Sequence, residues 1–454
     1  MPSGDGPPAG GDPAPASLRR RLLADVTPLK KFPQFRILWS GYLVSVLGSQ
    51  LTVVAVPYQV FRITHSSLDV GLLSLAQLGP LLVGSLVGGA VVDAVDRRRL
   101  LLVTELVLGG SSVGLGLDSV GGHPALWPLF VLTALAAAFS AVDSSARSAM
   151  LATIVGPESY AASSALWQLL FQVGQVAGPA IAGLLLTKFA VSVIYFADAG
   201  SFGIAFISVV MLGHVPRPAG RTTFSPRSIA DGFRFLKGRQ ALQATFVVDL
   251  DAMIFGMPRA VFPALGLNVF HGGAQAVGYL YSAPGAGALI GALTTGWVGR
   301  VERQGRAVVV SVAIWGAAIA GFGLCPLLAP ALVLLAIAGA ADVISAVFRN
   351  TILQTTVPDA LRGRLSAIHI GVVTGGPRLG DTETGAVAAL AGARVAVVSG
   401  GLACLGGLAV TAWRMPALMR YDRAAAVEAA AAAAAEVAAE AAAPGPAVSP
   451  SDPS

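Results

Sequence analysis

The chain has 454 residues, of which 55% are hydrophobic and only 12% are charged. A soluble protein of this length needs more polar surface, so the composition argues against a soluble enzyme or binding domain and predicts a polytopic membrane protein. The net charge of +6 does not call for nucleic acid. In the topology below, most of the 30 lysines and arginines lie in cytoplasmic segments and few lie outside, which is the positive-inside pattern.

Residues 1–36 are predicted to form a disordered, basic, cytoplasmic N-terminus. The segment Met1–Ser17 is rich in proline and glycine, and Arg19–Arg21 with Lys30 and Lys31 favour retention of this end inside the cell. The first apolar span then begins at Ile37 and is expected to be an uncleaved span rather than a cleaved signal.

Apolar windows along the chain predict twelve membrane-spanning helices. They cover residues 37–61, 68–92, 100–117, 125–148, 162–187, 190–213, 241–265, 275–299, 307–328, 331–353, 365–390 and 394–413. An even number of spans puts both termini of this multi-pass cell-membrane protein on the same side, and the basic N-terminus predicts that this side is the cytoplasm. The expected fold class is therefore an all-α membrane protein with two six-helix halves, residues 37–213 and 241–415.

The one long internal connection, residues 214–240, separates the two halves. Ser225 and Pro226 are typical of a helix start, and an apolar stripe with basic neighbours follows them. We expect an amphipathic helix on the inner leaflet, acting as a passive linker or as a regulatory binding segment. The alanine-rich residues 416–454 are expected to be a weakly helical cytoplasmic tail.

Several features recur in unchanged order in the two halves, roughly two hundred residues apart. Such a duplication predicts two parallel six-helix halves, the design of a rocker-type secondary transporter with its substrate site between them. The recurring features are the loop starts Gly89–Asp93 and Gly296–Arg300, the pairs Asp143…Arg147 and Asp342…Arg349, and the dipeptides Gly178-Pro179 and Gly376-Pro377.

Two of these motifs resemble those of a known transporter superfamily. The charged loop Gly89–Leu100 resembles the signature loop of the major facilitator superfamily. The fifth span, with Gly174, Gly178, Pro179 and Gly183, resembles the fifth-helix motif typical of exporters in that superfamily. The resemblance covers about residues 30–420 and implies the twelve-helix major facilitator fold, in which the first, fourth, seventh and tenth helices line a central cavity.

Three further stretches are similar to the enterobactin (siderophore) exporter branch and its relatives described as multidrug efflux pumps. They are Val54–Val60, Asp249–Pro263 and Ser366–Asp381. The chain departs from the superfamily pattern at Ala94 and Asp96, which stand where the loop usually has a basic residue and a glycine. The fourth span has no mid-membrane arginine, and Gln50 stands where some exporters carry an acid, so the resemblance alone does not assign the coupling residue.

Charged residues inside apolar spans are candidates for function, because burying a charge in a bilayer is costly. Asp249 and Asp251 lie about three turns into the seventh span, and Arg259 follows about two turns later. Pro258 interrupts this helix and frees backbone groups beside a cavity. We expect one of these aspartates to take up a proton during transport while Arg259 faces the substrate; a structural ion pair is the alternative.

Three more positions complete the candidates for coupling and substrate binding. Asp198 in the sixth span is either a third proton site or a partner in a helix-packing hydrogen bond. Arg378 is a candidate for the substrate cavity, although Asp381 three residues later predicts a local ion pair that would partly neutralise it. The resembled fold also favours Gln50 and Tyr58 in the first span as substrate contacts.

The cytoplasmic gate is expected at the matched charged loops. Asp143 and Arg147 have the i,i+4 spacing of a stabilising pair at the inner end of the fourth span. Asp93 is expected to lock the halves together in the outward-open state by pairing with basic or helix-end groups. The complete set of gate candidates is Asp93, Arg97, Arg98, Asp143, Arg147 and Arg300.

The predicted function is secondary active export of a small organic molecule by alternating access, with proton antiport implied by the resemblance and the buried acids together. Arg259 and Arg378 suit an anionic siderophore, whereas Asp249 and Asp251 suit a cationic amphiphilic drug, so both substrate classes stay open. A broad multidrug pump without a siderophore role is the closest alternative. A channel, or a sensor or scaffold with a transporter fold, would be a different class.

Enzyme chemistry finds little support in the sequence. There is no Gly-x-x-x-x-Gly-Lys-Ser/Thr loop for a nucleotide phosphate, and the five histidines lack metal-ligand spacing. Cys325 and Cys404 both lie in apolar spans and are expected to be buried thiols. We expect no cofactor, no metal and no nucleic acid; the expected partners are the substrate, protons and the lipid bilayer, and the expected state is a monomer.

Overall fold

The computed structural model describes residues 25–122, 124–213, 234–357 and 359–422. Within these ranges the chain is helical and contains no strand, which confirms the predicted all-α class. Ten of the described helices are long and apolar enough to cross a membrane. Large apolar side chains such as Trp127, Leu117 and Leu402 are exposed on their outer faces, as expected for a surface in contact with lipid.

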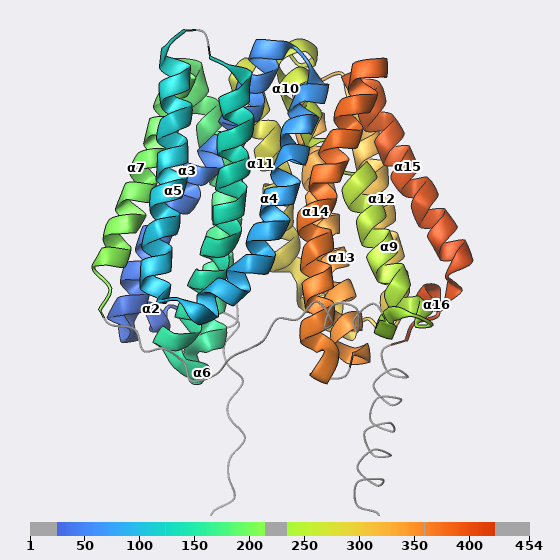
Figure 1. Cartoon of the computed structure of the whole chain (residues 1–454). Coiled ribbons are helices and arrows are strands. Elements are labelled where there is room, and N and C mark those ends of the chain that lie inside the picture. Colours follow the sequence, from blue (N-terminus) through green and yellow to red (C-terminus); the bar gives the residue numbers. More distant parts are fainter. Residues whose placement is uncertain (1–24, 123, 214–233, 358, 423–454) are drawn as a thin grey trace, which may run out of the picture.

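The first half of the chain forms one group of helices (Figure 1). They are α2 (Thr27–Lys31), α3 (Pro33–Thr64), α4 (Ser67–Ala94), α5 (Arg97–Val120), α6 (Leu126–Lys188) and α7 (Val191–Val210). Helix α6 holds two spans of the bundle, because Gly156 adopts φ 68° and ψ 174° and folds the chain back on itself. Glycine tolerates this backbone conformation, which the side chain of most other residues would disfavour.

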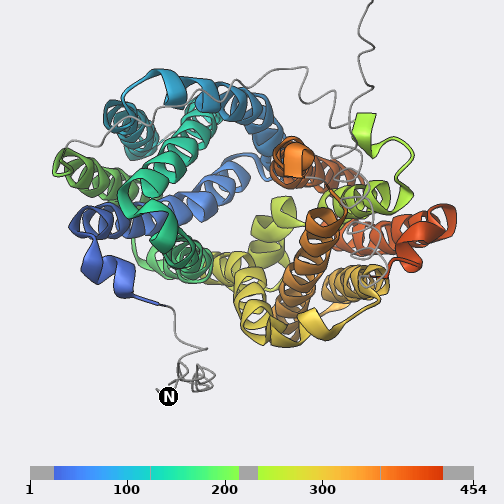
Figure 2. The same cartoon turned by 90° about the horizontal axis from the view of Figure 1, so that it is seen from below.

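The second half forms a matching group beside the first (Figures 1 and 2). It comprises α9 (Gln240–Phe255), η1 (Arg259–Val261), α10 (Phe262–Ala264), η2 (Leu265–Val269), α11 (Gly273–Thr294), η3 (Thr295–Arg300), α12 (Gln304–Leu324), α13 (Leu328–Thr356), α14 (Asp359–Ala391), α15 (Ala393–Arg414) and α16 (Pro416–Met419). Helix α14 has 33 residues, enough to span a bilayer, but its interior carries Arg378, Asp381 and Glu383. The ten candidate spans count α6 once and leave out α14. With α6 counted as two spans and α14 added, the helices are consistent with twelve spans.

The same close packing of small residues recurs in both halves. A Cβ atom on Gly88 of α4 would lie 3.2 Å from the Cα of Val142 on α6. A Cβ atom on Gly291 of α11 would lie 3.0 Å from the Cα of Ala340 on α13. Glycine therefore lets the second and fourth helices of each half approach closely, as small residues do between membrane helices.

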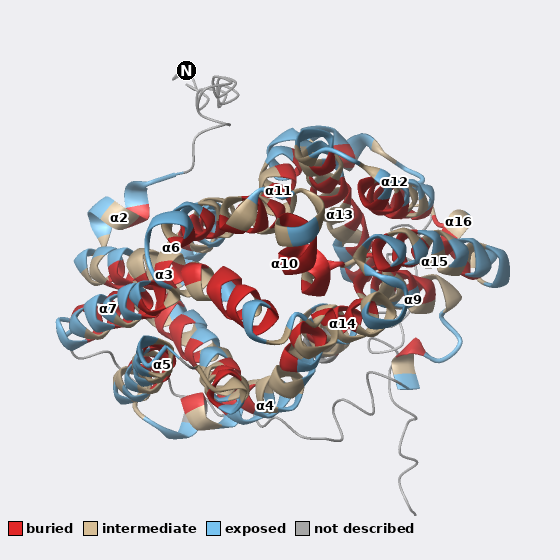
Figure 3. Cartoon of the chain, turned by 90° about the horizontal axis from the view of Figure 1, so that it is seen from above, coloured by how far each residue is buried: buried red, intermediate tan, exposed pale blue. Residues whose placement is uncertain are grey.

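The two ends of the bundle differ in charge and in packing. The end that carries Arg97–Arg99, Arg300 and Arg414 is called the basic end, and the other is called the opposite end. One cluster of buried apolar residues joins the halves, and it lies toward the opposite end, where Leu51 and Val54 of α3 meet Ala264 of α10 and Val277 of α11. Figure 3 shows α10 buried between the helices at this end.

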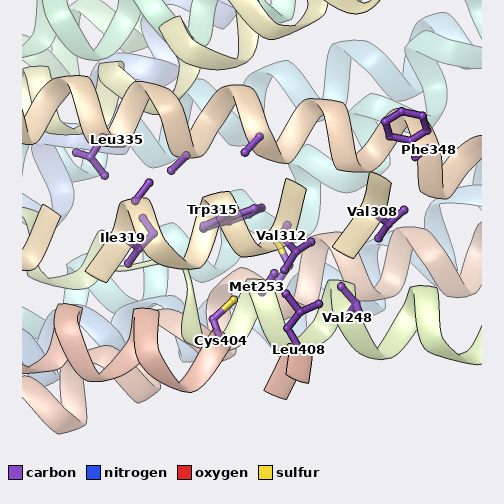
Figure 4. Packing of buried hydrophobic residues seen from close by; sticks show 14 of the residues in the cluster. Val248, Met253, Val308, Val312, Trp315, Ile319, Leu335, Phe348, Cys404 and Leu408 are labelled. Carbon is purple, nitrogen blue, oxygen red and sulfur yellow. The ribbon is translucent and has the colours of Figure 1, made fainter. Parts of the chain in front are cut away.

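The three other apolar clusters of the described chain each stay within one half. The largest fills the second half, where Trp315 of α12 lies between Val312 and Ile319, and Met253 of α9 belongs to the same cluster (Figure 4). Each half therefore has a core of its own, whereas the core shared by both is confined to the opposite end.

Several predicted segments lie outside the described residues. They are most of the basic N-terminus (1–24), most of the linker (214–233) and most of the alanine-rich tail (423–454). The predicted amphipathic helix of the linker is described only at residues 234–236, which are helical.

Candidate functional site

A cavity of about 540 Å³ lies between the two halves, a size that suits a small organic molecule. Most of its wall comes from α3, α4, α5, α6 and α7, while η1, α11 and α14 close it from the second half. The charged residues on the wall are Asp143, Asp198, Arg259, Arg378 and Asp381. The structure thus brings four sequence candidates together with Asp381, and Gln50 also lines the cavity.

The seventh helix breaks beside this cavity. Helix α9 ends at Phe255, and Arg259 begins the short helix η1 after Gly256 and Pro258. The indole Nε1 of Trp315 donates to the backbone oxygen of Gly256 at 2.9 Å, which pairs a carbonyl group that the break leaves free. The break predicted at Pro258 is therefore present, and it turns Arg259 toward the cavity.

Arg259 reaches the cavity without a direct ion-pair partner among the described residues. The hydroxyl of Tyr281 donates to the backbone oxygen of Arg259 at 3.1 Å and so fixes the main chain of η1. No carboxylate of the described residues lies within 4.0 Å of the Arg259 guanidinium. A half-buried guanidinium in this setting is available to an anionic group of a ligand.

The expected ion pair between Arg378 and Asp381 is not formed. Asp381 accepts a hydrogen bond of 2.8 Å from the hydroxyl of Ser74 on α4, whereas Arg378 donates to the backbone oxygen of Thr374 at 2.9 Å. The prediction was wrong because Asp381 lies at the contact of α14 with α4, where a partner from the other half is closer. Arg378 therefore lines the cavity without a carboxylate within 4.0 Å among the described residues.

Asp198 is a buried carboxylate whose hydrogen-bond partners are hydroxyl groups. Its Oδ2 accepts from Thr52 of α3 at 2.7 Å and from Ser112 of α5 at 2.8 Å, and only 2% of the residue is exposed. Its other oxygen has no hydrogen-bond partner among the described residues. No described Lys, Arg or His lies within 4.0 Å, so both sequence interpretations, a packing hydrogen bond and a proton site, remain compatible with this geometry.

Asp249 and Asp251 lie outside the cavity wall. Asp249 is buried and forms an ion pair with Arg349 of α13, and the Nδ1 of His369 lies 3.7 Å from its second oxygen. Asp251 faces α15, where a Cβ atom on Gly407 would lie 2.6 Å from the Asp251 carboxyl carbon. The sequence placed the two acids together on one helix, but they face different neighbours.

Each half contains a buried arginine that is shared by two acids. Arg147 donates from Nε to Asp143 at 2.6 Å, as the i,i+4 spacing predicted, and also pairs with Glu105 of α5. In the second half, Arg349 pairs with Asp249 and lies 3.7 Å from Asp342. These are the pairs whose order recurs in the sequence.

Glu105 was missed by the sequence reasoning, although an acid within an apolar span is a signal of its own. The guanidinium of Arg147 also lies over the ring of Tyr42, 4.7 Å from its centroid, and the ring of Tyr42 stacks on that of Trp167. A buried Arg147 thus has both ionic and aromatic neighbours, and it anchors α3, α5 and α6 to one another.

The predicted gate arginines bind within their own half. Arg97 donates to the backbone oxygen of Ala149 at 3.1 Å and to the hydroxyl of Thr153 at 2.8 Å, which ties α5 to α6. Arg98 donates to the backbone oxygens of Val209 and Val210, where cations are favourable because a helix C-terminus carries partial negative charge. Arg300 is exposed, and the side chain of Asp93 lies outside what the structure describes.

The fifth-helix motif makes close contacts on both sides of α6. A Cβ atom on Gly174 would lie 2.5 Å from a methyl group of Val46 on α3, and Gly178 also packs on α3, at Gln50. A Cβ atom on Gly183 would lie 2.8 Å from the Cα of Gly278 on α11, across the boundary between the halves. The motif therefore sets how closely the halves approach.

Tyr58 does not line the cavity, contrary to the expectation of a substrate contact. Its ring is buried in the apolar cluster that joins the halves, and its hydroxyl accepts from Arg62 at 3.1 Å. The first helix does line the cavity, but only along the part between Tyr42 and Pro57. Beyond that point it packs against α10 and α11.

Comparison with known proteins shows the family to which this arrangement belongs. Residues 24–444 match the family described as transmembrane secretion effector. The chain belongs to this family of major facilitator transporters. The enterobactin exporters EntS of Shigella flexneri and of Escherichia coli are 30% identical to it over 373 residues, which cover 82% of this chain and 89% of each relative.

Solved structures confirm the major facilitator fold. The nucleoside transporter NupG superposes with a TM-score of 0.69 at 13% identity, over 86% of this chain and 100% of that one. A bacterial homologue of the human lysosomal transporter Spinster, in an inward-facing and unoccupied conformation, gives a TM-score of 0.63 at 16% identity, over 87% of this chain and 96% of that one. The family is one of transporters and not of enzymes, in agreement with the sequence.

Proposed function

We propose that this transporter exports a small organic molecule from the cytoplasm by alternating access, and that proton entry drives the cycle. The observation that carries the proposal is the position of the cavity between two halves that share an apolar core only toward the opposite end. A cavity closed on one side and extending toward the other is the arrangement that alternating access requires.

The charge of the loops supports the direction of loading. The basic end is assigned to the cytoplasm, because loops rich in lysine and arginine stay inside. The cavity extends from Pro57 and Leu73, nearer the opposite end, to Tyr42 and Ser144, nearer the basic end. In this state the cavity would bind its substrate from the cytoplasm, as export requires. The enterobactin exporters among its relatives support the same direction.

Among the three acids considered for proton coupling, the geometry favours Asp198. It lines the cavity and is held by the hydroxyls of Thr52 and Ser112 alone, so a proton taken up there would not have to displace a bound cation. Asp249 is held by Arg349 and is assigned a structural role in the second half. Asp251, which packs against α15, is the weaker alternative.

Two substrate classes follow from the cavity and the relatives. Arg259 and Arg378 on the wall support an anionic siderophore, the class named in the relatives. Asp198 and Asp381 on the same wall support a cationic amphiphilic drug as the second candidate.

Uptake into inside-out vesicles tests direction, coupling and substrate class together. We expect an iron-free siderophore to accumulate only when a proton gradient is imposed, and the Asp198→Asn variant to lose this dependence. Asp69→Asn, in the first turn of α4, is the matched control and should accumulate substrate normally. Accumulation of a cationic dye alone would select the drug-efflux alternative. Flux that ignores the gradient and shows a large unitary conductance would identify a channel instead.

A further inference from the structure

The ion-pair cluster of the second half carries one net negative charge. Arg349 of α13 pairs with Asp249 of α9 and lies 3.7 Å from Asp342, so two carboxylates share one guanidinium. The side chains of Arg349 and Asp249 are only 4% and 1% exposed. A net charge at such a buried place is costly, and one bound proton would remove it.

His369 of α14 lies beside this cluster. Its Nδ1 is 3.7 Å from Oδ2 of Asp249, and that carboxylate oxygen is buried without a hydrogen-bond partner among the described residues. This distance is within the range of an ion pair but too long for a hydrogen bond, so a protonated imidazole would move closer in order to donate. It would also bring the charge of the cluster to zero. Imidazole is the side chain that ordinarily gains and loses a proton near neutral pH.

The charges around His369 act in opposite directions. Asp249 of α9 attracts a protonated imidazole, whereas Arg349 of α13 repels it. The other elements that pack against α14 are α4, α15 and η1, and they place no carboxylate within 4.0 Å of His369 among the described residues. One attractive and one repulsive neighbour suit a site that must both bind a proton and release it.

A small polar cavity reaches His369 from the side of the basic end. Its volume of about 10 Å³ is room for about one water molecule. Thr245 and Leu353 on its wall lie one helical turn closer to the basic end than Asp249 and Arg349, and Asn350 on the same wall is exposed. The cavity is lined by Thr245, Phe246, Arg349, Asn350, Leu353 and His369. None of these six residues lines the central cavity between the halves, so a proton bound here would not meet the substrate.

The matching cluster of the first half lacks an imidazole. There Arg147 also faces two carboxylates, those of Glu105 and Asp143, but no histidine of the described chain lies within 4.0 Å of either acid. Asp143 lines the central cavity instead. Both halves thus keep an arginine and two acids, whereas the imidazole and its separate small cavity belong to the second half.

We propose that His369 and Asp249 form a second proton-binding site of the transport cycle, which exchanges its proton with the cytoplasm through the small cavity. The proton passes from a hydronium ion in that cavity to an imidazole nitrogen and leaves a water molecule behind, and release is the reverse step. Asp249 keeps its pair with Arg349 and stabilises the imidazolium. The role in transport rests on the proposed export function, and it adds one proton per cycle to the one proposed at Asp198.

Nitrogen-15 spectra of the histidine-labelled full chain in lipid nanodiscs test the site without any transport. The signal of His369 is identified by its absence from His369→Gln, and we expect it to change from the protonated to the neutral form between about pH 5 and about pH 8.5. His271→Gln is the matched control, because His271 is exposed at the opposite end, and it should leave this signal in place. A His369 imidazole that keeps one protonation state over the whole range would overturn the proposal.

The limit of substrate accumulation in inside-out vesicles measures how many protons move with each substrate. With a gradient of one pH unit and no membrane potential, each coupled proton supplies about 1.4 kcal/mol and raises this limit about tenfold. With iron-free enterobactin, the compound named in the relatives, as the probe, we expect His369→Gln and His369→Arg each to lower the limit about tenfold. One side chain is neutral and the other permanently charged, so whichever variant folds decides the result. His271→Gln should keep the original limit, and an unchanged limit in a folded His369 variant would contradict the second site.

The two experiments separate this inference from the proposed export. Gradient-driven uptake with the same limit in the original chain and in the His369 variants would remove the second site and leave export standing. A titrating His369 without gradient-driven uptake of any substrate would remove export and leave a proton-binding site.

Discussion

Replacing Gly183 by alanine should shift the transporter away from the state seen in the structure. Gly183 of α6 meets Gly278 of α11 across the boundary between the halves, nearer the opposite end. An added Cβ atom would lie 2.8 Å from the Gly278 Cα, 3.0 Å from the oxygen of Ala274 and 3.2 Å from the oxygen of Gln275. All three neighbours are backbone atoms, which cannot rotate out of the way as a side chain can.

The expected size of the effect follows from these distances. Carbon atoms in contact prefer a separation of about 3.5–4.0 Å, so the two helices would have to move apart by roughly 1 Å. Overpacking of this kind costs about 1–3 kcal/mol. If the halves rock as proposed, the cost falls only on the state in which they touch at the opposite end. The ratio of outward-open to inward-open molecules should then rise about 5- to 150-fold.

Cysteine accessibility in intact cells measures this ratio. Val53 lines the cavity, so Val53→Cys in a background without Cys325 and Cys404 reports on access from outside. A membrane-impermeant maleimide should label this cysteine faster when Gly183→Ala is added. Gly203→Ala on α7 is the control, because a Cβ atom there meets nothing within 4 Å. An unchanged labelling rate in Gly183→Ala would refute the role of this contact.

Three further outcomes are expected. Asp198→Asn should lower the free energy of unfolding by at most about 1–3 kcal/mol, because the asparagine oxygen can still accept from Thr52 and Ser112 while the asparagine amide lacks an acceptor. In proteoliposomes this variant should lose gradient-driven uptake but keep substrate exchange. Arg147→Gln should lower the free energy of unfolding by about 3–5 kcal/mol, because Glu105 and Asp143 stay buried without their cation. Thermal unfolding in detergent measures this loss, and the control variant Arg99→Gln should unfold like the unchanged protein. Trp315→Phe should lower the free energy of unfolding by about 1–3 kcal/mol in the same assay, because the substitution leaves the backbone oxygen of Gly256 unpaired. An unchanged melting temperature would contradict a stabilising role for this hydrogen bond.

The sequence predicted the helices of this protein better than their contacts. The predicted spans fall on described helices, and the break at Pro258 is present. The i,i+4 pair of Asp143 and Arg147 is also confirmed, because both residues lie on one helix and local spacing decides whether they meet. The third member of that cluster, Glu105, comes from another helix, and no local spacing reveals it.

The wrong assignments share one physical cause. Arg378 and Asp381 had the right spacing for a pair, but Ser74 of the other half lies closer to the carboxylate. Tyr58 lies on a cavity-lining helix, but at its level the helix packs against the second half. Both outcomes depend on how the halves meet, and this is a property of the folded chain rather than of any single segment.

The sequence by itself determined the class of molecule. That class follows from signals that are local or compositional, namely the long apolar spans, the one-sided distribution of basic residues and the duplicated order of motifs. The tertiary structure alone decided which face of each helix lines the cavity. Lipid tails and the interior of a helix bundle are both apolar, so a membrane helix carries little periodic signal that separates its buried face from its exposed one. For the same reason only the structure shows that Asp198, and not Asp249, lines the cavity that Arg259 and Arg378 also line.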